Sequence, residues 1–273
     1  MAEKTYITGN FFNQALELRD GPKWGMSLKA AGSMRFRWSE VNPNRNSFLN
    51  VMRGGHQLCQ VELIHSRIVM AVDSPAELEG VRADGIITRN KNLFPIITVA
   101  DCMPIFLFEP ESQVFGVLHS GWKGTGIVKD ALLLAKEKYG SDPGKFSIVM
   151  GPHIHQCCYN VDEERAKYFI ENFTPDCVHK GKENQLRFRN KEQALNGMDT
   201  LASKKINDEE CMSLGYSLSL AKANLAVLAE MGIPENNIAV SNDCTCCNPI
   251  FGSFRRQNPV EGTFTVQAAW VSW

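Results

Sequence analysis

The chain has 273 residues, a formal net charge of -1 and 44% hydrophobic residues. A chain of this length can bury a large core, and no linker-like or low-complexity segment divides it, so we expect a single domain over residues 1–273. The near-zero charge argues against nucleic acid as a partner, because duplex binding needs a basic surface.

The sequence also carries no membrane or export signal. Its first residues lack an apolar stretch of signal-peptide length, and no window approaches the roughly 18 apolar residues of a membrane-spanning helix. We therefore expect a cytoplasmic protein with no membrane partner. Its nine cysteines then indicate thiols or metal ligands, because disulfides are uncommon in the cytosol.

The predicted elements begin with a strand-like alternation over 33–38 and a helix over 44–53, with Asn42 as N-cap and Pro43 in the first turn. A second helix should begin at Ile127 and be capped by Gly140. Apolar runs predict the strands 68–72, 84–88, 94–100, 105–108, 114–118, 146–150, 238–240 and 263–271, with 105–108 and 114–118 as antiparallel neighbours. Further helices are predicted over 162–172 and 218–231.

This order of elements decides the expected fold class. Helices and short strands follow one another without strict βαβ alternation. The sequence therefore predicts an α+β fold with a mixed β-sheet core flanked by helices.

Cys102 and His119 are the first candidates for a metal site. A catalytic zinc ion takes three protein ligands and keeps a fourth position for water. Both residues lie at strand ends, so pairing of those strands would bring the side chains to one rim of the sheet. From spacing alone, a cysteine near a strand end is more often a buried thiol that acts as a small hydrophobic residue.

Three further patterns have two interpretations each. The run Cys244-Thr-Cys246-Cys247 is typical of structural zinc knuckles or of reduced thiols in a loop, and Cys157-Cys158 is far from it in sequence. The turn Gly121–Gly126, with Lys123 and Gly124, opens a helix and could bind an anion or simply pack Trp122. Arg255 and Arg256 could clamp phosphate or be solvated.

Several of these segments together resemble the laccase-domain family, also known as polyphenol oxidases or purine nucleoside phosphorylases. The resemblance runs from about Asp84 to the C-terminus. It rests on four segments: Thr98-Val-Ala-Asp-Cys102-Met-Pro, Val117-Leu-His119-Ser-Gly-Trp-Lys-Gly, Gly151-Pro-His-Ile-His-Gln-Cys-Cys158-Tyr-Asn-Val, and Cys244-Thr with Phe254-Arg-Arg256.

The resemblance implies a zinc ion on His65, Cys102 and His119, with His56 as the alternative first ligand; copper is the less favoured metal. It also implies phosphorolysis of purine nucleosides, including methylthioadenosine, and deamination of adenosine. The chain departs from the family pattern at Ser66, Lys123 and Ser219, where the family usually has Gly, Arg and Asp, while Asn224 is kept.

These implications give each candidate residue an expected role. Cys102 and His119 are expected to be catalytic as zinc ligands, and Asp101 either orients a ligand or caps a turn. Arg255, Arg256, Lys123 and Gly124 are candidates for binding phosphate or nucleoside. The expected partners are therefore a nucleoside and phosphate, and the oligomeric state stays open.

Three other functions remain open on the sequence alone. A copper-dependent polyphenol oxidase needs about ten histidine ligands, and the chain has six histidines. A cysteine hydrolase or editing factor acting on peptidoglycan precursors would use Cys102 as nucleophile and His119 as base. A binding module without catalysis is the third.

Overall fold

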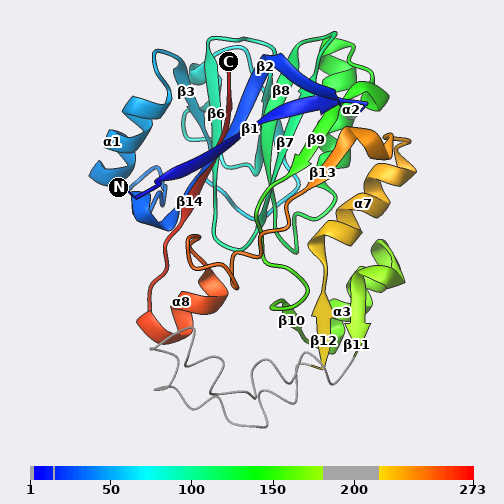
Figure 1. Cartoon of the computed structure of the whole chain (residues 1–273). Helices are drawn as coiled ribbons and strands as arrows, with labels where there is room; N and C mark the ends of the chain where they lie inside the picture. Colours follow the sequence, from blue (N-terminus) through cyan, green and yellow to red (C-terminus); the bar gives the residue numbers. More distant parts are fainter. Residues whose placement is uncertain (1–2, 15, 181–214) are drawn as a thin grey trace.

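A computed structural model describes residues 3–14, 16–180 and 215–273 of the chain (Figure 1). Two large sheets and one small sheet account for the described strands. The five-stranded sheet has the order β1-β2-β14-β6-β3, and it joins both ends of the chain because β14 lies between β2 and β6. Its strands are β1 (Tyr6–Asn13), β2 (Leu16–Ser27), β3 (Gln57–Gln60), β6 (Leu93–Val99) and β14 (Gln267–Ser272).

The six-stranded sheet has the order β13-β9-β7-β8-β5-β4. At its centre β7 and β8 form the predicted antiparallel pair, with Met103 opposite Ser120 and Pro104 opposite His119. Parallel pairs at both edges make the sheet mixed. Its strands are β4 (Val69–Ala71), β5 (Gly85–Thr88), β7 (Met103–Glu109), β8 (Val114–Ser120), β9 (Ser147–Met150) and β13 (Ile238–Val240).

The two large sheets pack face to face, and helices cover their outer faces. Alternation along β7 decides this layering: Ile105 and Leu107 belong to the apolar cluster shared with α2 (Ile127–Tyr139) and α7 (Leu220–Glu230). Phe106 and Phe108 point the other way, into a cluster with Phe11 of the five-stranded sheet. Helix α1 (Pro43–Met52) packs its Leu49 against the opposite face of the five-stranded sheet.

A smaller unit lies at the lower end of the view in Figure 1. It holds the three-stranded sheet β10-β12-β11 together with α3, while α8 lies on the opposite side of the same end. These elements are β10 (Asn160–Val161), α3 (Glu163–Asn172), β11 (Val178–Lys180), β12 (Tyr216–Leu218) and α8 (Phe254–Glu261). Short 3-10 helices cover Lys29–Ala31, Pro75–Leu78, Pro143–Lys145, Pro175–Cys177 and Glu235–Asn237.

Most predicted elements are present, and local capping explains their bounds. Asn42 accepts a hydrogen bond from the Arg45 N–H at the start of α1, and Gly140 ends α2 in the left-handed conformation. Ser219 caps α7 through the Lys222 N–H, so this helix begins after Leu218, which lies in β12. The last strand starts at Gln267 rather than at residue 263.

The predicted strand over 33–38 is wrong. The side-chain amide of Asn42 donates to the carbonyl oxygens of Ser33 and Arg35, so these carbonyls do not bond to a neighbouring strand. The segment is irregular, and its Arg35, Phe36 and Arg37 line a pocket. Among the described helices, none is long and apolar enough to cross a bilayer.

Candidate metal centre and pocket

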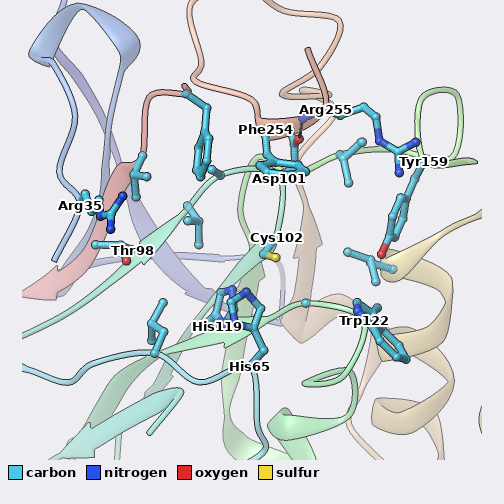
Figure 2. Close-up of a pocket in the computed structure, with 18 of the residues that line it drawn as sticks. Arg35, His65, Thr98, Asp101, Cys102, His119, Trp122, Tyr159, Phe254 and Arg255 are labelled. Carbon is cyan, nitrogen blue, oxygen red and sulfur yellow. Dashed lines mark hydrogen bonds between the residues drawn. The ribbon is translucent and has the colours of Figure 1, made fainter. Parts of the chain in front are cut away.

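Three side chains from distant parts of the chain meet at one rim between the two large sheets. The donor atoms of His65, Cys102 and His119 all lie within 4.8 Å of one another (Figure 2). The two imidazole rings have centroids 4.9 Å apart and are nearly perpendicular, at 84°. His56 is not in this group; its Nδ1 lies 2.8 Å from the Arg53 carbonyl oxygen, after α1.

The pairing of β7 with β8 brings Cys102 and His119 together. Met103 opens β7 opposite Ser120 and Pro104 lies opposite His119, so Cys102, directly before β7, lies beside the end of β8 that carries His119. The expectation that the strand before Cys102 pairs with the strand of His119 is wrong, because β6 lies in the other sheet and pairs with β14 and β3. It is β7, which begins directly after Cys102, that pairs with β8.

His65 reaches the site from the connection between β3 and β4. Its backbone is in the left-handed region, with φ of 58°, which is uncommon for a residue with a side chain. The Asp84 carboxylate holds this turn, because it accepts hydrogen bonds from the His65 N–H at 2.9 Å and the Ser66 N–H at 2.6 Å. The Ser66 hydroxyl donates to the same carboxylate at 2.7 Å.

Asp84 also orients His119. The His119 Nδ1 lies 2.8 Å from Asp84 Oδ1, and both side chains are buried. A carboxylate on Nδ1 leaves Nε2 as the metal-binding atom, which is how carboxylates commonly support histidine ligands. From the sequence, Asp84 was expected only to begin a strand. The signal that could have found it is an acidic residue directly before a strand that is wholly buried.

The electrostatics of the three side chains favour a thiolate. Burial opposes ionisation of Cys102, but the charge of His119 and hydrogen bonds from both imidazoles outweigh it and lower the pKa of the thiol to about 6. Burial also opposes protonation of His119, while the Cys102 thiolate and Asp84 together raise its pKa to about 10. Thiolate is the form in which cysteine binds zinc.

The local backbone makes room for an ion. A Cβ atom on Gly121 would lie 2.9 Å from the Cys102 sulfur and 3.7 Å from each imidazole, so a side chain there would displace the sulfur. Two imidazoles and one thiolate facing a pocket are a donor set that suits zinc with one open position. The residues present therefore fit the metal that the sequence resemblance implies.

The three side chains lie at the base of a cavity of about 520 Å³, within the usual range for small-molecule sites. Figure 2 shows Trp122 and Tyr159 on one side, Arg35 on the other, and Phe254 and Arg255 above. Nine of the residues that line the cavity are aromatic residues or arginines: Arg35, Phe36, Arg37, Trp122, Tyr159, Arg165, Phe254, Arg255 and Phe264.

The Asp101 side chain lines this cavity but bonds to the segment above it. Its carboxylate accepts hydrogen bonds from the Thr245 hydroxyl at 2.6 Å, the Ser253 hydroxyl at 3.0 Å and the Arg255 N–H at 2.6 Å. Burial raises its pKa, against these hydrogen bonds, which lower it. Of the two roles expected for Asp101, these contacts correspond to the capping carboxylate, here at the first turn of α8.

The two arginines of α8 have different surroundings. Arg255 lines the cavity, and its Nη2 donates to the Asn160 carbonyl at 3.0 Å. Arg256 is buried, and its guanidinium donates to backbone carbonyls, among them those of Thr245 at 2.7 Å and Cys246 at 2.8 Å. Arg256 therefore organises a loop and does not line the cavity.

The glycine turn after β8 is a packing feature in this fold. Gly124 contacts backbone, since a Cβ there would lie 2.8 Å from the Ser66 carbonyl oxygen. The Gly126 N–H donates to the buried Asn224 side chain at 3.2 Å, so the Gly126 N–H does not face the cavity. Lys123 is exposed, with its ammonium over the Trp122 ring. Neither Lys123 nor Gly124 lines the cavity.

Comparison with known proteins identifies the family of this chain. Residues 27–271 match the family model described as multi-copper polyphenol oxidoreductase laccase. The chain belongs to this family. The match begins well before Asp84, so it covers more of the chain than the sequence motifs indicated.

Named relatives and a solved structure extend the comparison. Purine nucleoside phosphorylase YlmD of Bacillus subtilis is 32% identical over 182 residues, or 66% of this chain and 55% of the relative. Adenosine deaminase RL5, from an unknown prokaryotic organism, is 29% identical over 212 residues, or 76% of this chain and 70% of the relative. The chain thus spans little more than half the length of the first of these.

The crystal structure of YlmD from Geobacillus stearothermophilus matches the fold with a TM-score of 0.71 and 21% identity, covering 92% of each chain. This likeness confirms the predicted α+β fold class.

Proposed function

We propose that this protein is a zinc-dependent enzyme of purine nucleosides. Its reactions would be phosphorolysis of the glycosidic bond, with methylthioadenosine among the substrates, and hydrolytic deamination of adenosine. The observation that carries the proposal is the His65, Cys102 and His119 group at the base of a cavity lined by aromatic rings and arginines. The printed names of the relatives, a purine nucleoside phosphorylase and an adenosine deaminase, support the same substrate class.

In this proposal His65, Cys102 and His119 hold the zinc ion, and the Asp84 carboxylate orients the two histidines. When bound, zinc supplies a Lewis acid that lowers the pKa of a coordinated water toward 7. The Cys102 thiolate offsets part of the positive charge, and His119 presents Nε2 because Asp84 occupies its Nδ1. A reducing cytoplasm, where we place the protein, would keep Cys102 in the form that binds metal.

The upper part of the cavity would bind the substrates. Phe254 is 47% exposed and meets Phe264 edge to face, which leaves an aromatic face for a purine base. Arg255 keeps guanidinium donors beyond the one that bonds to Asn160, and they suit a phosphate. Asp101 would act as a positioning residue, because its carboxylate holds the Arg255 backbone.

Arg165 is a further cation of this cavity. Its guanidinium lies 4.4 Å from the centre of the Trp122 ring, and its Nε is buried without a hydrogen-bond partner. An anionic group in the cavity would supply that partner. We therefore add Arg165 to Arg255 as a phosphate ligand, in place of Arg256, Lys123 and Gly124.

Zinc suits this centre better than copper. A multicopper oxidase fills several centres with many histidines. Within the part of the chain that the structure describes, only His65 and His119 of the six histidines belong to a group that could hold a metal. Metal analysis of protein purified from medium that contains both metals tests the assignment. About one copper per chain at this centre, with phenol oxidation, would reverse it.

The decisive test joins metal content to turnover. Cys102→Ala and His119→Ala should each lose the metal at this centre, together with release of purine base from inosine and phosphate and of inosine from adenosine. Cys177→Ala is the matched control, because Cys177 is a buried thiol that donates to the Thr174 carbonyl, away from the cavity. Full turnover by a folded, metal-free Cys102→Ala variant would refute the proposal.

One observation favours a second function, a cysteine hydrolase acting on peptidoglycan precursors. The pKa of Cys102 is lowered to about 6 beside His119, as in nucleophilic cysteines. Chelation and alkylation separate the two functions. Loss of nucleoside turnover on chelation, with recovery on adding zinc, supports the metal enzyme. A chelator-resistant hydrolase that alkylation of Cys102 inactivates would support the alternative.

A further inference from the structure

Four cysteines that are far apart in the sequence gather in a second cluster. The sulfur of Cys247 lies 3.7 Å from that of Cys157 and 3.3 Å from that of Cys158, and the last two sulfurs are 3.7 Å apart. Cys244 completes the group, since all four sulfurs lie within 4.8 Å of one another. The fold therefore brings Cys157 and Cys158 against the Cys244 knuckle, although the two runs are far apart in the sequence.

These spacings match those around a tetrahedral zinc ion. Zinc–sulfur bonds of about 2.3 Å place the four sulfurs of a tetrahedral site about 3.8 Å apart. Three of the sulfurs already have separations of 3.3 to 3.7 Å. Two cysteines from each of two loops are also the usual composition of a structural zinc site.

We propose that Cys157, Cys158, Cys244 and Cys247 bind a second zinc ion, which joins two loops beside the cavity. On binding, each thiol releases its proton to solvent, so four thiolates and one Zn²⁺ form a centre of net charge -2. The Arg256 guanidinium, which donates to the carbonyls of Thr245 and Cys246 in the same knuckle, places a positive charge beside it.

The site would be structural, because four protein ligands leave no position for water. Two hydrogen bonds already align the two loops: the Thr245 N–H donates to the His153 carbonyl at 3.0 Å, and the His155 N–H donates to the Cys244 sulfur at 3.4 Å. Both loops lead to the cavity, since Tyr159 follows Cys158 and Thr245 bonds to Asp101. The second zinc would thus fix one wall of the cavity.

The cysteines of this region differ in solvent exposure, and one of them offers a control. Cys247 is exposed, which gives a metal ion or a chelator a way in. Cys246 is buried in the same knuckle but does not belong to the group of four. Cys246→Ala therefore removes a neighbouring thiol without removing a proposed ligand.

The test counts zinc in the full-length protein, purified under reducing conditions, by elemental mass spectrometry. Wild type and Cys246→Ala should hold two zinc ions per chain, while Cys157→Ser/Cys247→Ser and Cys102→Ala should each hold one. Cobalt-substituted Cys102→Ala should keep the strong sulfur-to-cobalt absorption of a four-thiolate site. Because Cys102→Ala lacks the first metal, this result does not depend on nucleoside turnover. Exposed Cys247→Ser alone serves if the double variant does not fold.

Two outcomes would overturn the proposal. One is a wild-type protein with a single zinc ion that Cys102→Ala loses completely. The other is peptide mapping that finds disulfides among the four cysteines in protein alkylated directly from reducing cytosol. Loss of zinc in Cys157→Ser/Cys247→Ser, with the first zinc retained, would support it.

Discussion

The Asp84 carboxylate and the His119 imidazole form a buried pair, with Oδ1 and Nδ1 2.8 Å apart. The same carboxylate accepts the N–H groups of His65 and Ser66. One side chain therefore orients one imidazole of the proposed zinc centre directly and holds the turn that carries the other. The proposed centre depends on a residue that does not line the cavity.

Replacing Asp84 should weaken metal binding more than it changes the fold. Asp84→Asn removes the negative charge that orients His119 and the turn at His65. We expect the affinity for zinc at this centre to fall about 10- to 100-fold, as for other carboxylates that support histidine ligands. Competition with a chromophoric chelator measures it, and Asp130→Asn, which breaks only an exposed pair with Arg67, is the control. Unchanged affinity in folded Asp84→Asn would contradict the role.

Gly121→Ala should displace the Cys102 sulfur. The added Cβ would lie 2.9 Å from that sulfur, closer than packed atoms allow. We expect weaker zinc binding and reduced turnover in a protein that still folds. Gly55→Ala is the matched control, because a Cβ at Gly55 meets nothing within 4 Å. If both variants bind zinc as wild type does, Gly121 is not needed for access to the centre.

The sequence predicted the strands of this centre better than its supporting contacts. Apolar runs and caps indicate β7, β8 and α2, because local patterns determine these elements. The approach of His65 depends on a left-handed turn and on Asp84, which lies 19 residues away in the chain. No local pattern records such a contact, so only the family resemblance pointed to His65.

The cysteine clusters illustrate the same limit. Cys157 and Cys247 are 90 residues apart, and their contact depends on the loop alignment between His153 and Cys244.

The arginine pair shows a related limit. Arg255 and Arg256 are neighbours in the sequence, but the first turn of α8 points one into the cavity and the other into the knuckle. Adjacent residues on a helix face different directions, so a pair of arginines does not predict a clamp.

Asn224 should contribute to stability rather than to chemistry. Its buried side chain accepts the Gly126 N–H and donates to the Leu220 carbonyl and the Ser120 hydroxyl, which joins the starts of α2 and α7. Asn224→Ala leaves the Gly126 N–H without its partner, so we expect a loss of about 1–3 kcal/mol in the free energy of unfolding. Urea denaturation measures it, with exposed Asn46→Ala as control; a change within about 0.5 kcal/mol would contradict the prediction.

Arg255 and Arg256 offer the sharpest separation of phosphate binding from structure. Deamination uses water and phosphorolysis uses phosphate, so loss of a phosphate ligand should affect only the second reaction. For Arg255→Ala we expect the KM for phosphate to rise about 10- to 150-fold, the equivalent of one charge-assisted hydrogen bond of about 1.5–3 kcal/mol, while adenosine deamination changes little.

Arg256→Ala should behave differently, because its guanidinium bonds to the carbonyls of Thr245 and Cys246 and faces the knuckle. Three buried acceptors and one partly buried acceptor lose their donor, so thermal stability should fall and both reactions should decline together. Melting curves and parallel assays of the two variants distinguish these patterns. If Arg256→Ala raised only the KM for phosphate, Arg256 and not Arg255 would be the phosphate ligand, and the cavity would have to open toward the knuckle.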